Sequence, residues 1–148
     1  ASARIFHEFP ETLPAIRNNP DLIPTFIEEA LRYYSPFSAT VRRTTRAVTL
    51  GGIEIPKGAL LLPLIASANR DERVFDRPEV FQIDRNPNPH LALGFGIHFC
   101  LGAHLARLEG KIAVQCLADQ FQSIQLADPP QTEVGGLGGP KAMDVILS

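Results

Sequence analysis

Apolar side chains recur every three or four positions in the C-terminal third of this chain. Their spacings of four, three, four and four residues match one face of an α-helix, in the series Leu101, Leu105, Leu108, Ile112 and Cys116. We therefore predict a helix with one buried face and with Cys116 in the core. Cys100 would lie at the N-terminus of this helix. A second helix is predicted for residues 23–36.

Between the two helices the pattern changes to short strands joined by turns. The strands are expected within residues 41–45, 48–55 and 59–68. The Gly51-Gly52 pair suits a tight hairpin, because both residues tolerate positive φ. Pro63 marks an edge strand or an interruption of the last apolar run.

The rest of the chain is irregular in pattern. Residues 69–90 are charged and rich in proline and asparagine. After Asp128-Pro129-Pro130 comes a glycine-rich stretch from Gly135 to Gly139, and the apolar Val145-Ile146-Leu147 predicts a terminal hairpin. No break in composition divides the chain, so we expect one domain over residues 1–148. Its fold class would be α+β, mainly helical with small β-hairpins.

Charge and composition exclude several classes of function. The 148 residues carry a formal net charge of −2, which gives no electrostatic case for nucleic-acid binding. No apolar stretch reaches the ~20 residues of a membrane span, and no signal peptide is evident. The two cysteines agree with a reducing compartment, so a cytoplasmic location is expected.

The most informative residue is Cys100, which a glycine-rich loop delivers to the start of the predicted helix. The free N–H groups and the positive end of the helix dipole favour the thiolate form of its sulfur. The loop residues Gly94, Gly96 and Gly102 have no Cβ, so the backbone can lie against a wide, flat group. Haem is such a group.

Two other interpretations of Cys100 compete with haem binding. A lone cysteine is often a small buried hydrophobic residue. A zinc site could use His98, Cys100, His104 and Cys116, but residue 116 is more than four helical turns from residue 100, too far to share one ion. The same distance excludes a disulfide if the helix is intact.

Residues 93–102 resemble the signature of the cytochrome P450 family of haem-thiolate monooxygenases, Phe-Gly-x-Gly-x-His/Arg-x-Cys-x-Gly. Only Leu93 differs, at the position where phenylalanine is usual. The resemblance implies haem b (iron protoporphyrin IX) with Cys100 as the axial iron ligand. It also implies that His98 and Arg42 pair with haem propionates. The remaining cofactor-binding residues implied are Gly94, Phe95, Gly96 and Gly102.

A second resemblance concerns Glu29 and Arg32. An arbitrary Glu-x-x-Arg pair is usually exposed and of little energetic value. Here Glu-Ala-Leu-Arg-Tyr-x-Ser-Pro is similar to a family signature in which the pair is buried and held by a second arginine. Arg85, in Phe-x-x-x-Arg, is the best candidate for that partner, because the alternative Pro-Glu-Arg-Phe position has Val80. The cluster is expected to be structural and to fix the loop that carries Cys100.

Family members are more than twice as long as this chain. The resemblance therefore covers their C-terminal haem-binding portion, and it implies that the N-terminal half and the central oxygen-activating helix are absent. The expected activity of the whole enzyme is insertion of one oxygen atom from O2 into a small organic substrate, with electrons from a ferredoxin-like or flavin donor. No catalytic residue beyond the haem ligand is expected in this chain.

An alternative is a truncated, haem-free remnant that acts as a binding or assembly module. We expect the 148 residues alone to lack coupled turnover, because the resembling enzymes need a closed distal pocket. We also expect a homo-oligomer or swapped dimer, because the apolar face of the helix after Cys100 would lack its usual cover.

Overall fold

The computed structural model describes residues 1–128, 131–132 and 140–148 of the chain. Its main helices are α1 (Ser2–Glu8), α2 (Thr12–Asn18), α3 (Ile23–Tyr33), α4 (Ile65–Ala68) and α5 (Ala103–Gln120), with the short 3-10 turns η1 (Pro20–Leu22) and η2 (Gly96–His98). The strands are β1 (Arg42–Arg43), β2 (Val48–Leu50), β3 (Ile53–Ile55), β4 (Leu60–Leu61), β5 (Ile124–Leu126), β6 (Gln131–Thr132), β7 (Pro140–Ala142) and β8 (Val145–Leu147). The expected mixture of helices with small β-hairpins is confirmed.

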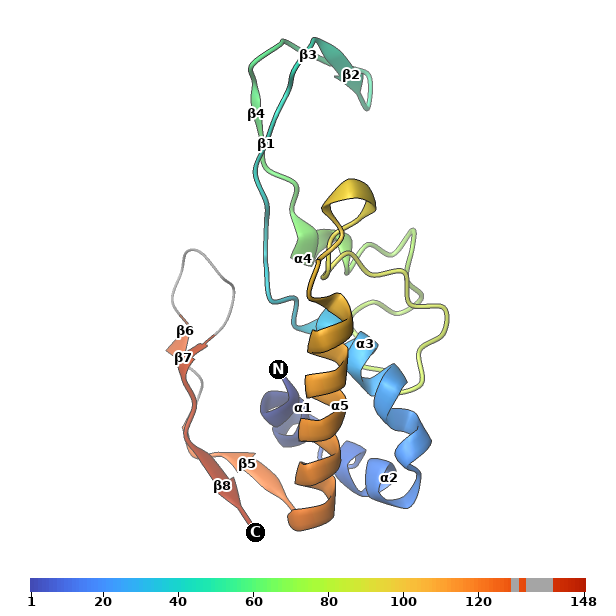
Figure 1. Ribbon diagram of the computed structural model, residues 1–148, viewed down its shortest axis with the longest axis vertical. Coiled ribbons are helices and arrows are strands. Elements are labelled where there is room, and N and C mark those ends of the chain that lie inside the picture. Colours follow the sequence, from blue (N-terminus) through green and yellow to red (C-terminus); the bar gives the residue numbers. More distant parts are fainter. Residues whose placement is uncertain (129–130, 133–139) are drawn as a thin grey trace.

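A helical body forms the core of the molecule, and α5 lies in front of the other helices in this view (Figure 1). Helices α2 and α3 contact one side of α5, and α1 lies against β5. Aromatic rings fill the space between them: Phe6 stacks on Phe26 at 5.2 Å between ring centroids, and Phe81 meets Phe26 edge-on at 5.8 Å. Phe81 comes from the irregular segment 69–90, so this segment is anchored in the core.

The strands between the helices form a thin arm that extends away from the body (Figure 1). Strand β1 pairs with β4, and β2 pairs with β3, both antiparallel. The predicted tight turn is confirmed, since Gly51 and Gly52 have φ of 58° and 81°. Pro63 interrupts the last apolar run, because strand β4 ends at Leu61 and the next residues to take regular structure form α4.

The C-terminal residues pair beside the helical body. Strand β8 lies antiparallel to β5, and β6 lies antiparallel to β7. The predicted pairing of Val145–Leu147 is therefore confirmed, with Ile124–Leu126 as its partner strand. Pro129-Pro130 and the glycine-rich stretch 135–139 lie outside the described residues. Within the described residues, no helix is long and apolar enough to cross a membrane.

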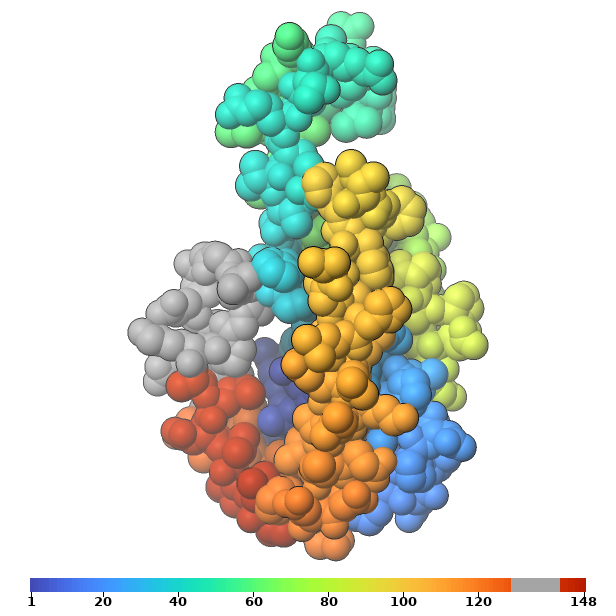
Figure 2. All heavy atoms as spheres, viewed as in Figure 1, coloured from blue at the N-terminus to red at the C-terminus, as the bar shows by residue number. Residues whose placement is uncertain are grey.

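The prediction from periodicity that the apolar stripe of α5 is buried is wrong, whereas the expectation that this face lies uncovered in the 148-residue chain is confirmed. The exposed fraction lies between 54% and 102% for the four large residues Leu101, Leu105, Leu108 and Ile112. Cys116 is also exposed and is not part of the core. Figure 2 shows α5 and the preceding loop, in orange and yellow, open along one face of the molecule.

The opposite face of α5 is the buried one, and small residues explain why. Its buried side chains are Ala103, Val114 and Ala118. A Cβ on Gly110 would lie only 3.5 Å from Cδ1 of Ile27 in α3, so the two helices approach closely there. Hydrophobic periodicity detected the large side chains, whereas the neighbouring helices pack against the small ones.

Candidate functional site

The loop before α5 holds Cys100 through its own backbone. The N–H of Cys100 donates to the carbonyl of Leu93 at 2.7 Å, which closes the loop on itself. Gly94 has φ of 79°, and a Cβ there would lie 2.6 Å from the carbonyl oxygen of His98. Only glycine fits this position without a shift of the backbone. Helix α5 begins three residues after Cys100, with Gly102 as its N-cap.

Cys100 lies at the wall of a cavity of about 290 Å³. Five of the residues predicted to bind haem line this cavity together: Arg42, Gly94, Phe95, His98 and Cys100. Arg42 comes from β1 and the other four from the loop before α5, so the structure brings residues 58 positions apart to one place. The remaining predicted residues, Gly96 and Gly102, are not in the lining. A Cβ on Gly102 would lie 3.9 Å from Sγ of Cys100, and one on Gly96 would face open space.

Other lining residues escaped the sequence analysis. They are apolar or small side chains from three segments: Phe37, Thr40, Pro63, Ile65, Leu91 and Ala92. Leu93, which the sequence analysis named only as the departure from the signature, also lines the cavity. Apolar residues of this kind carry no chemical signature in a sequence, because the same residues fill any core. Only the predicted strand region 59–68, which contains Pro63 and Ile65, pointed toward this wall.

The residues present fit a haem group. The wall is mainly apolar, as a porphyrin face requires, and it contains one thiol. Arg42 and His98 supply nitrogen donors that can pair with carboxylates, and both side chains are exposed. Among the described residues, no three His, Cys, Asp or Glu side chains gather as a metal-ion site.

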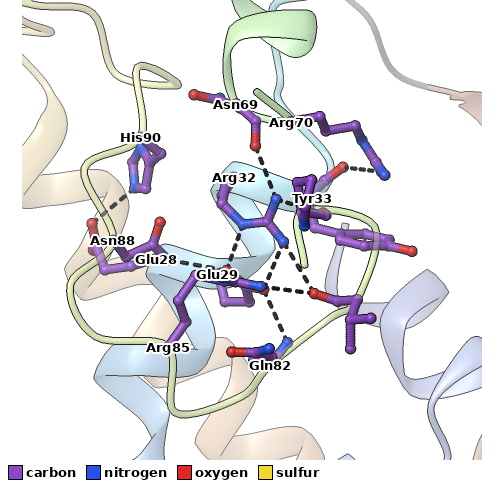
Figure 3. Close-up of polar contacts among 12 residues, drawn as sticks. Glu28, Glu29, Arg32, Tyr33, Asn69, Arg70, Gln82, Arg85, Asn88 and His90 are labelled. Carbon is purple, nitrogen blue, oxygen red and sulfur yellow. Dashed lines mark hydrogen bonds and ion pairs between the residues drawn. The ribbon is translucent and has the colours of Figure 1, made fainter. Parts of the chain in front are cut away.

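Behind this loop, Glu29 is fully buried and accepts hydrogen bonds from four neighbours (Figure 3). Arg32 donates Nε and Nη2 to its two oxygens at 2.7 and 2.8 Å. Arg85 donates Nε to both oxygens at 3.0 Å. The N–H of Gln82 and the side-chain amide of Asn88 donate at 2.9 and 3.1 Å. The structure thus brings Glu29, Arg32 and Arg85 into one satisfied cluster, which limits the free-energy cost of burying the charges.

The two arginines also hold the irregular segment 69–90. Arg32 donates Nη1 to the carbonyls of Asn69 and Pro78 at 2.9 and 2.8 Å. Arg85 donates to the carbonyls of Asp76 and Val80 at 2.7 and 3.0 Å. Side chains therefore satisfy backbone groups that a helix or sheet would satisfy elsewhere.

Asn69 is a residue whose role the sequence analysis did not assign. It is fully buried, its Oδ1 accepts the N–H of Leu91 at 2.7 Å, and its Nδ2 donates to Oγ of Ser35 at 2.8 Å. The sequence contains no specific signal for this role, because a polar residue commonly follows an apolar run, and only its burial shows that it must be hydrogen-bonded. Asn69 connects the end of α4 to the segment that leads into the cysteine loop.

Glu28, next to the buried cluster, binds a different set of partners. Arg107 of α5 donates Nε and Nη2 to its oxygens at 2.6 and 2.8 Å, and Nε2 of His90 lies 3.0 Å from Oε2. The hydrogen bond from Arg107 is the largest cause that holds the pKa of Glu28 at about 2. The pKa of Arg107 is raised, first by the bond to Glu28, and the sulfur of Cys100 acts electrostatically in the same direction. The pair joins α3 to α5 near the cysteine.

A cysteine at a glycine loop, an apolar cavity and a buried Glu-Arg-Arg cluster match a known family of proteins. The sequence model described as Cytochrome P450 matches residues 15–142, and the chain belongs to the cytochrome P450 family. That family implies haem as the cofactor, and it supports a monooxygenase-type function for the full-length relatives.

Curated relatives resemble this chain closely over part of their length. The biotin biosynthesis cytochrome P450 of Bacillus subtilis (strain 168) is 46% identical over 121 residues, which are 82% of this chain and 31% of the relative. Cytochrome P450 119 of Sulfolobus acidocaldarius is 50% identical over 121 residues, 82% of this chain and 33% of the relative. The chain thus spans about a third of the length of these relatives.

Solved structures agree with the fold. A crystal structure of P450BioI in complex with an acyl carrier protein ligated with hexadec-9Z-enoic acid superposes with a TM-score of 0.94 at 40% identity, over 99% of this chain and 39% of that chain. The structure of CYP109E1 from Bacillus megaterium in complex with testosterone gives a TM-score of 0.91 at 38% identity, over 97% of this chain and 41% of that chain. The arrangement of this chain is therefore that of part of a cytochrome P450.

Proposed function

We propose that this chain is the haem-thiolate binding portion of a cytochrome P450 monooxygenase. The observation that carries the proposal is the position of Cys100, a thiol held by a glycine loop at the wall of an apolar cavity. In the proposed role, Sγ of Cys100 is the axial ligand of the iron of haem b. A thiolate-ligated haem supplies the chemistry that inserts one oxygen atom from O2 into an organic substrate.

The residues of the chain contribute orientation and a dry environment. Arg42 and His98 both line the cavity, and we assign them to the haem propionates, to which they would donate hydrogen bonds. Phe37, Leu91 and Ile65 belong to the apolar lining of the cavity, and in the whole enzyme they would limit the access of water to the sulfur. The Glu29 cluster has a structural role in this proposal: it fixes segment 69–90, from which the chain continues into the cysteine loop.

The substrate and partners belong to the whole enzyme. One relative has been solved with a fatty acyl group on a carrier protein and another with a steroid, so we propose a small, mainly apolar organic substrate for this protein as well. Electrons would come from a ferredoxin-like or flavin donor. We propose a cytoplasmic location, in keeping with the free thiols of Cys100 and Cys116.

Spectroscopy of the haem-loaded chain tests the ligand assignment. The chain is mixed with haem, reduced and exposed to carbon monoxide. We expect the red-shifted Soret band that thiolate ligation produces. The Cys100→Ala variant should lose this band, whereas Cys116→Ala, which removes the other exposed thiol, should retain it. A wild-type spectrum typical of histidine ligation, or an unchanged band in Cys100→Ala, would contradict the assignment.

A second candidate function is a haem-free binding or assembly module. The exposed apolar stripe of α5 favours it, because such surfaces mark interaction sites. The same titration separates the two candidates. A module would leave the spectrum of the added haem unchanged, while the haem-binding chain would shift and sharpen its Soret band until one haem is bound per chain.

A further inference from the structure

We propose that His90 positions the cysteine loop, and that it does so as the neutral tautomer with the proton on Nε2. The inference deepens the proposed function, since it names a positioning residue for the Cys100 ligand. It rests on hydrogen bonds that join α3, α5 and the segment before the loop.

The two ring nitrogens of His90 face partners of opposite character. Nδ1 lies 3.2 Å from the backbone nitrogen of Ala92, and Nε2 lies 3.0 Å from Oε2 of Glu28. A backbone N–H can only donate, so Nδ1 must accept. The carboxylate of Glu28 can only accept, so Nε2 must donate. One tautomer of the neutral imidazole satisfies both contacts, and the side chain of His90 is only 3% exposed, so water does not replace either one.

Glu28 is itself held in place. Two hydrogen bonds from Arg107, at 2.6 and 2.8 Å, fix the plane of its carboxylate. Arg107 lies on α5, the helix that begins just after Cys100. The orientation of the imidazole therefore depends on α3, which carries Glu28, and on α5, which carries Arg107. Figure 3 shows the contact with Glu28. Of the neighbouring charged groups, Glu29 and Arg85 pair with each other, and Lys111 lines the same pocket as Glu28 and Arg107.

His90 acts on Cys100 through the backbone between them. Ala92 is 4% exposed, and its fixed N–H sets the orientation of the Leu91–Ala92 peptide, directly before Leu93. The carbonyl of Leu93 then accepts the N–H of Cys100 at 2.7 Å. The preceding amide, that of Leu91, donates to Oδ1 of Asn69 at 2.7 Å. Two consecutive amides are thus held by buried side chains rather than by a sheet, which defines the path of the chain into the loop.

Nuclear magnetic resonance of the chain itself tests the tautomer. Long-range proton–nitrogen spectra of the imidazoles are expected to show His90 with a protonated Nε2 and an unprotonated Nδ1. His104, which is exposed on α5, serves as the internal comparison and should show the averaged pattern of an imidazole in water. A proton on Nδ1 of His90, or the averaged pattern, would overturn the inference. This measurement of the tautomer requires neither a variant nor haem.

Three variants then separate positioning from simple filling of space. His90→Asn retains an acceptor at the place of Nδ1 but does not reach Glu28, whereas His90→Leu fills the site without either hydrogen bond. His104→Asn is the surface control. In His90→Leu we expect amide hydrogen exchange at Ala92 and Cys100 to become about tenfold faster, the effect of losing one buried hydrogen bond. His90→Asn should restore most of the protection, and equal exchange in both variants would overturn the inference.

The haem-loaded protein links this result to the cysteine. After reduction under carbon monoxide, His90→Leu should lose a measurable share of the thiolate-type Soret band, while His90→Asn and His104→Asn should stay close to wild type. If wild type gives no thiolate band but the tautomer and exchange results hold, the proposed function fails and the positioning role stands. If the thiolate band is present and His90→Leu leaves both the band and the exchange unchanged, the positioning role fails alone.

Discussion

At the scale of single residues, Glu29 accepts hydrogen bonds from four neighbouring residues at once. Its carboxylate is enclosed by two guanidinium groups, a backbone N–H and a side-chain amide, with no exposed surface. Such a group is satisfied only while all partners remain. Removal of the carboxylate leaves two buried cations facing each other without a counter-charge.

We therefore expect Glu29→Ala to lower the free energy of unfolding by about 3–5 kcal/mol, the usual cost of breaking a buried ion pair. Urea unfolding followed by circular dichroism measures the loss. Glu54→Ala, which removes an exposed carboxylate from β3, is the matched control and should change stability by less than about 0.5 kcal/mol. An equal effect of the two substitutions would show that the cluster contributes nothing beyond a surface ion pair.

The glycines of the cysteine loop allow a second comparison of paired variants. Gly94 and Gly96 both have positive φ, of 79° and 59°, but a Cβ would collide with the carbonyl of His98 only at Gly94. Gly94→Ala should thus destabilise the chain by about 1–3 kcal/mol and weaken haem binding, whereas Gly96→Ala should cost only about 1 kcal/mol for its dihedral strain. Thermal melting and haem titration measure both effects. A milder effect at Gly94 than at Gly96 would mean that the loop relaxes freely.

At the residue scale, the sequence indicates which residues are neighbours where a motif is continuous, but not where contacts are distant. Cys100 and His98 stand in one decapeptide, so their proximity needed no structure. Glu28 meets His90 and Arg107 across 62 and 79 residues, and no local pattern indicates such a pairing. Arg42 was connected to the loop only through the family resemblance, because its local sequence resembles any exposed strand.

At the scale of elements, α3 is bonded both to segment 69–90 and to α5. Two neighbouring carboxylates on it point to different partners: Glu29 to segment 69–90 and Glu28 to α5 and His90. The helix therefore ties the irregular segment to the helix that follows the cysteine.

Acid should weaken the contact of α3 with α5. The pKa of Glu28 is about 2 in the folded chain, below its ordinary value of 4.5, so its contribution to stability is complete above about pH 4.5 and is lost as pH falls toward about 2. We expect about 2 kcal/mol from this group, after allowance for its partial exposure. Urea unfolding at several pH values, compared with Glu28→Gln, isolates the effect. The variant should lack this part of the pH dependence, and parallel curves would contradict the expectation.

Helix α5 shows what periodicity alone can decide. The spacing of large apolar residues correctly predicted a helix over this region, because the period of 3.6 residues is a property of one segment. It did not predict which face is buried, because burial depends on neighbours far away in sequence. Gly110, Ala103 and Ala118, which allow α2 and α3 to pack closely, look unremarkable in the sequence.

At the scale of the whole molecule, the apolar stripe of α5 is exposed on the surface. This stripe and the exposed Phe95 and Ile97 of the loop are together called the apolar ridge. Figure 2 shows α5 and the loop before it, in orange and yellow, along one face of the molecule. A ridge of this kind promotes association in water, because contact removes apolar area from the solvent.

We expect the 148-residue chain to self-associate when it is purified by itself. The double variant Leu105→Glu with Ile112→Glu should raise the dissociation constant at least about tenfold, equivalent to about 1.4 kcal/mol. Leu50→Glu is the matched control, because Leu50 is 54% exposed and Leu105 is 58% exposed, but Leu50 lies on the arm. Size-exclusion chromatography with light scattering measures the mass. A monomer in wild type, or equal masses in all three proteins, would disprove an association through the ridge.

The thin arm formed by β1 to β4 has a different consequence. Several basic residues of the arm, Arg42, Arg43, Arg46 and Lys57, are exposed, whereas Arg32 and Arg85 are buried in the body. A protease that cuts after basic residues therefore has several accessible sites on the arm, in addition to Arg73 and Arg77 of segment 69–90. Cleavage on the arm breaks the chain between α3 and α4. The cut would separate Arg42 from the wall that contains Cys100. A ligand that spans Arg42 and Cys100 should slow this cleavage, so digestion rates would report occupancy of the cavity without any spectrum.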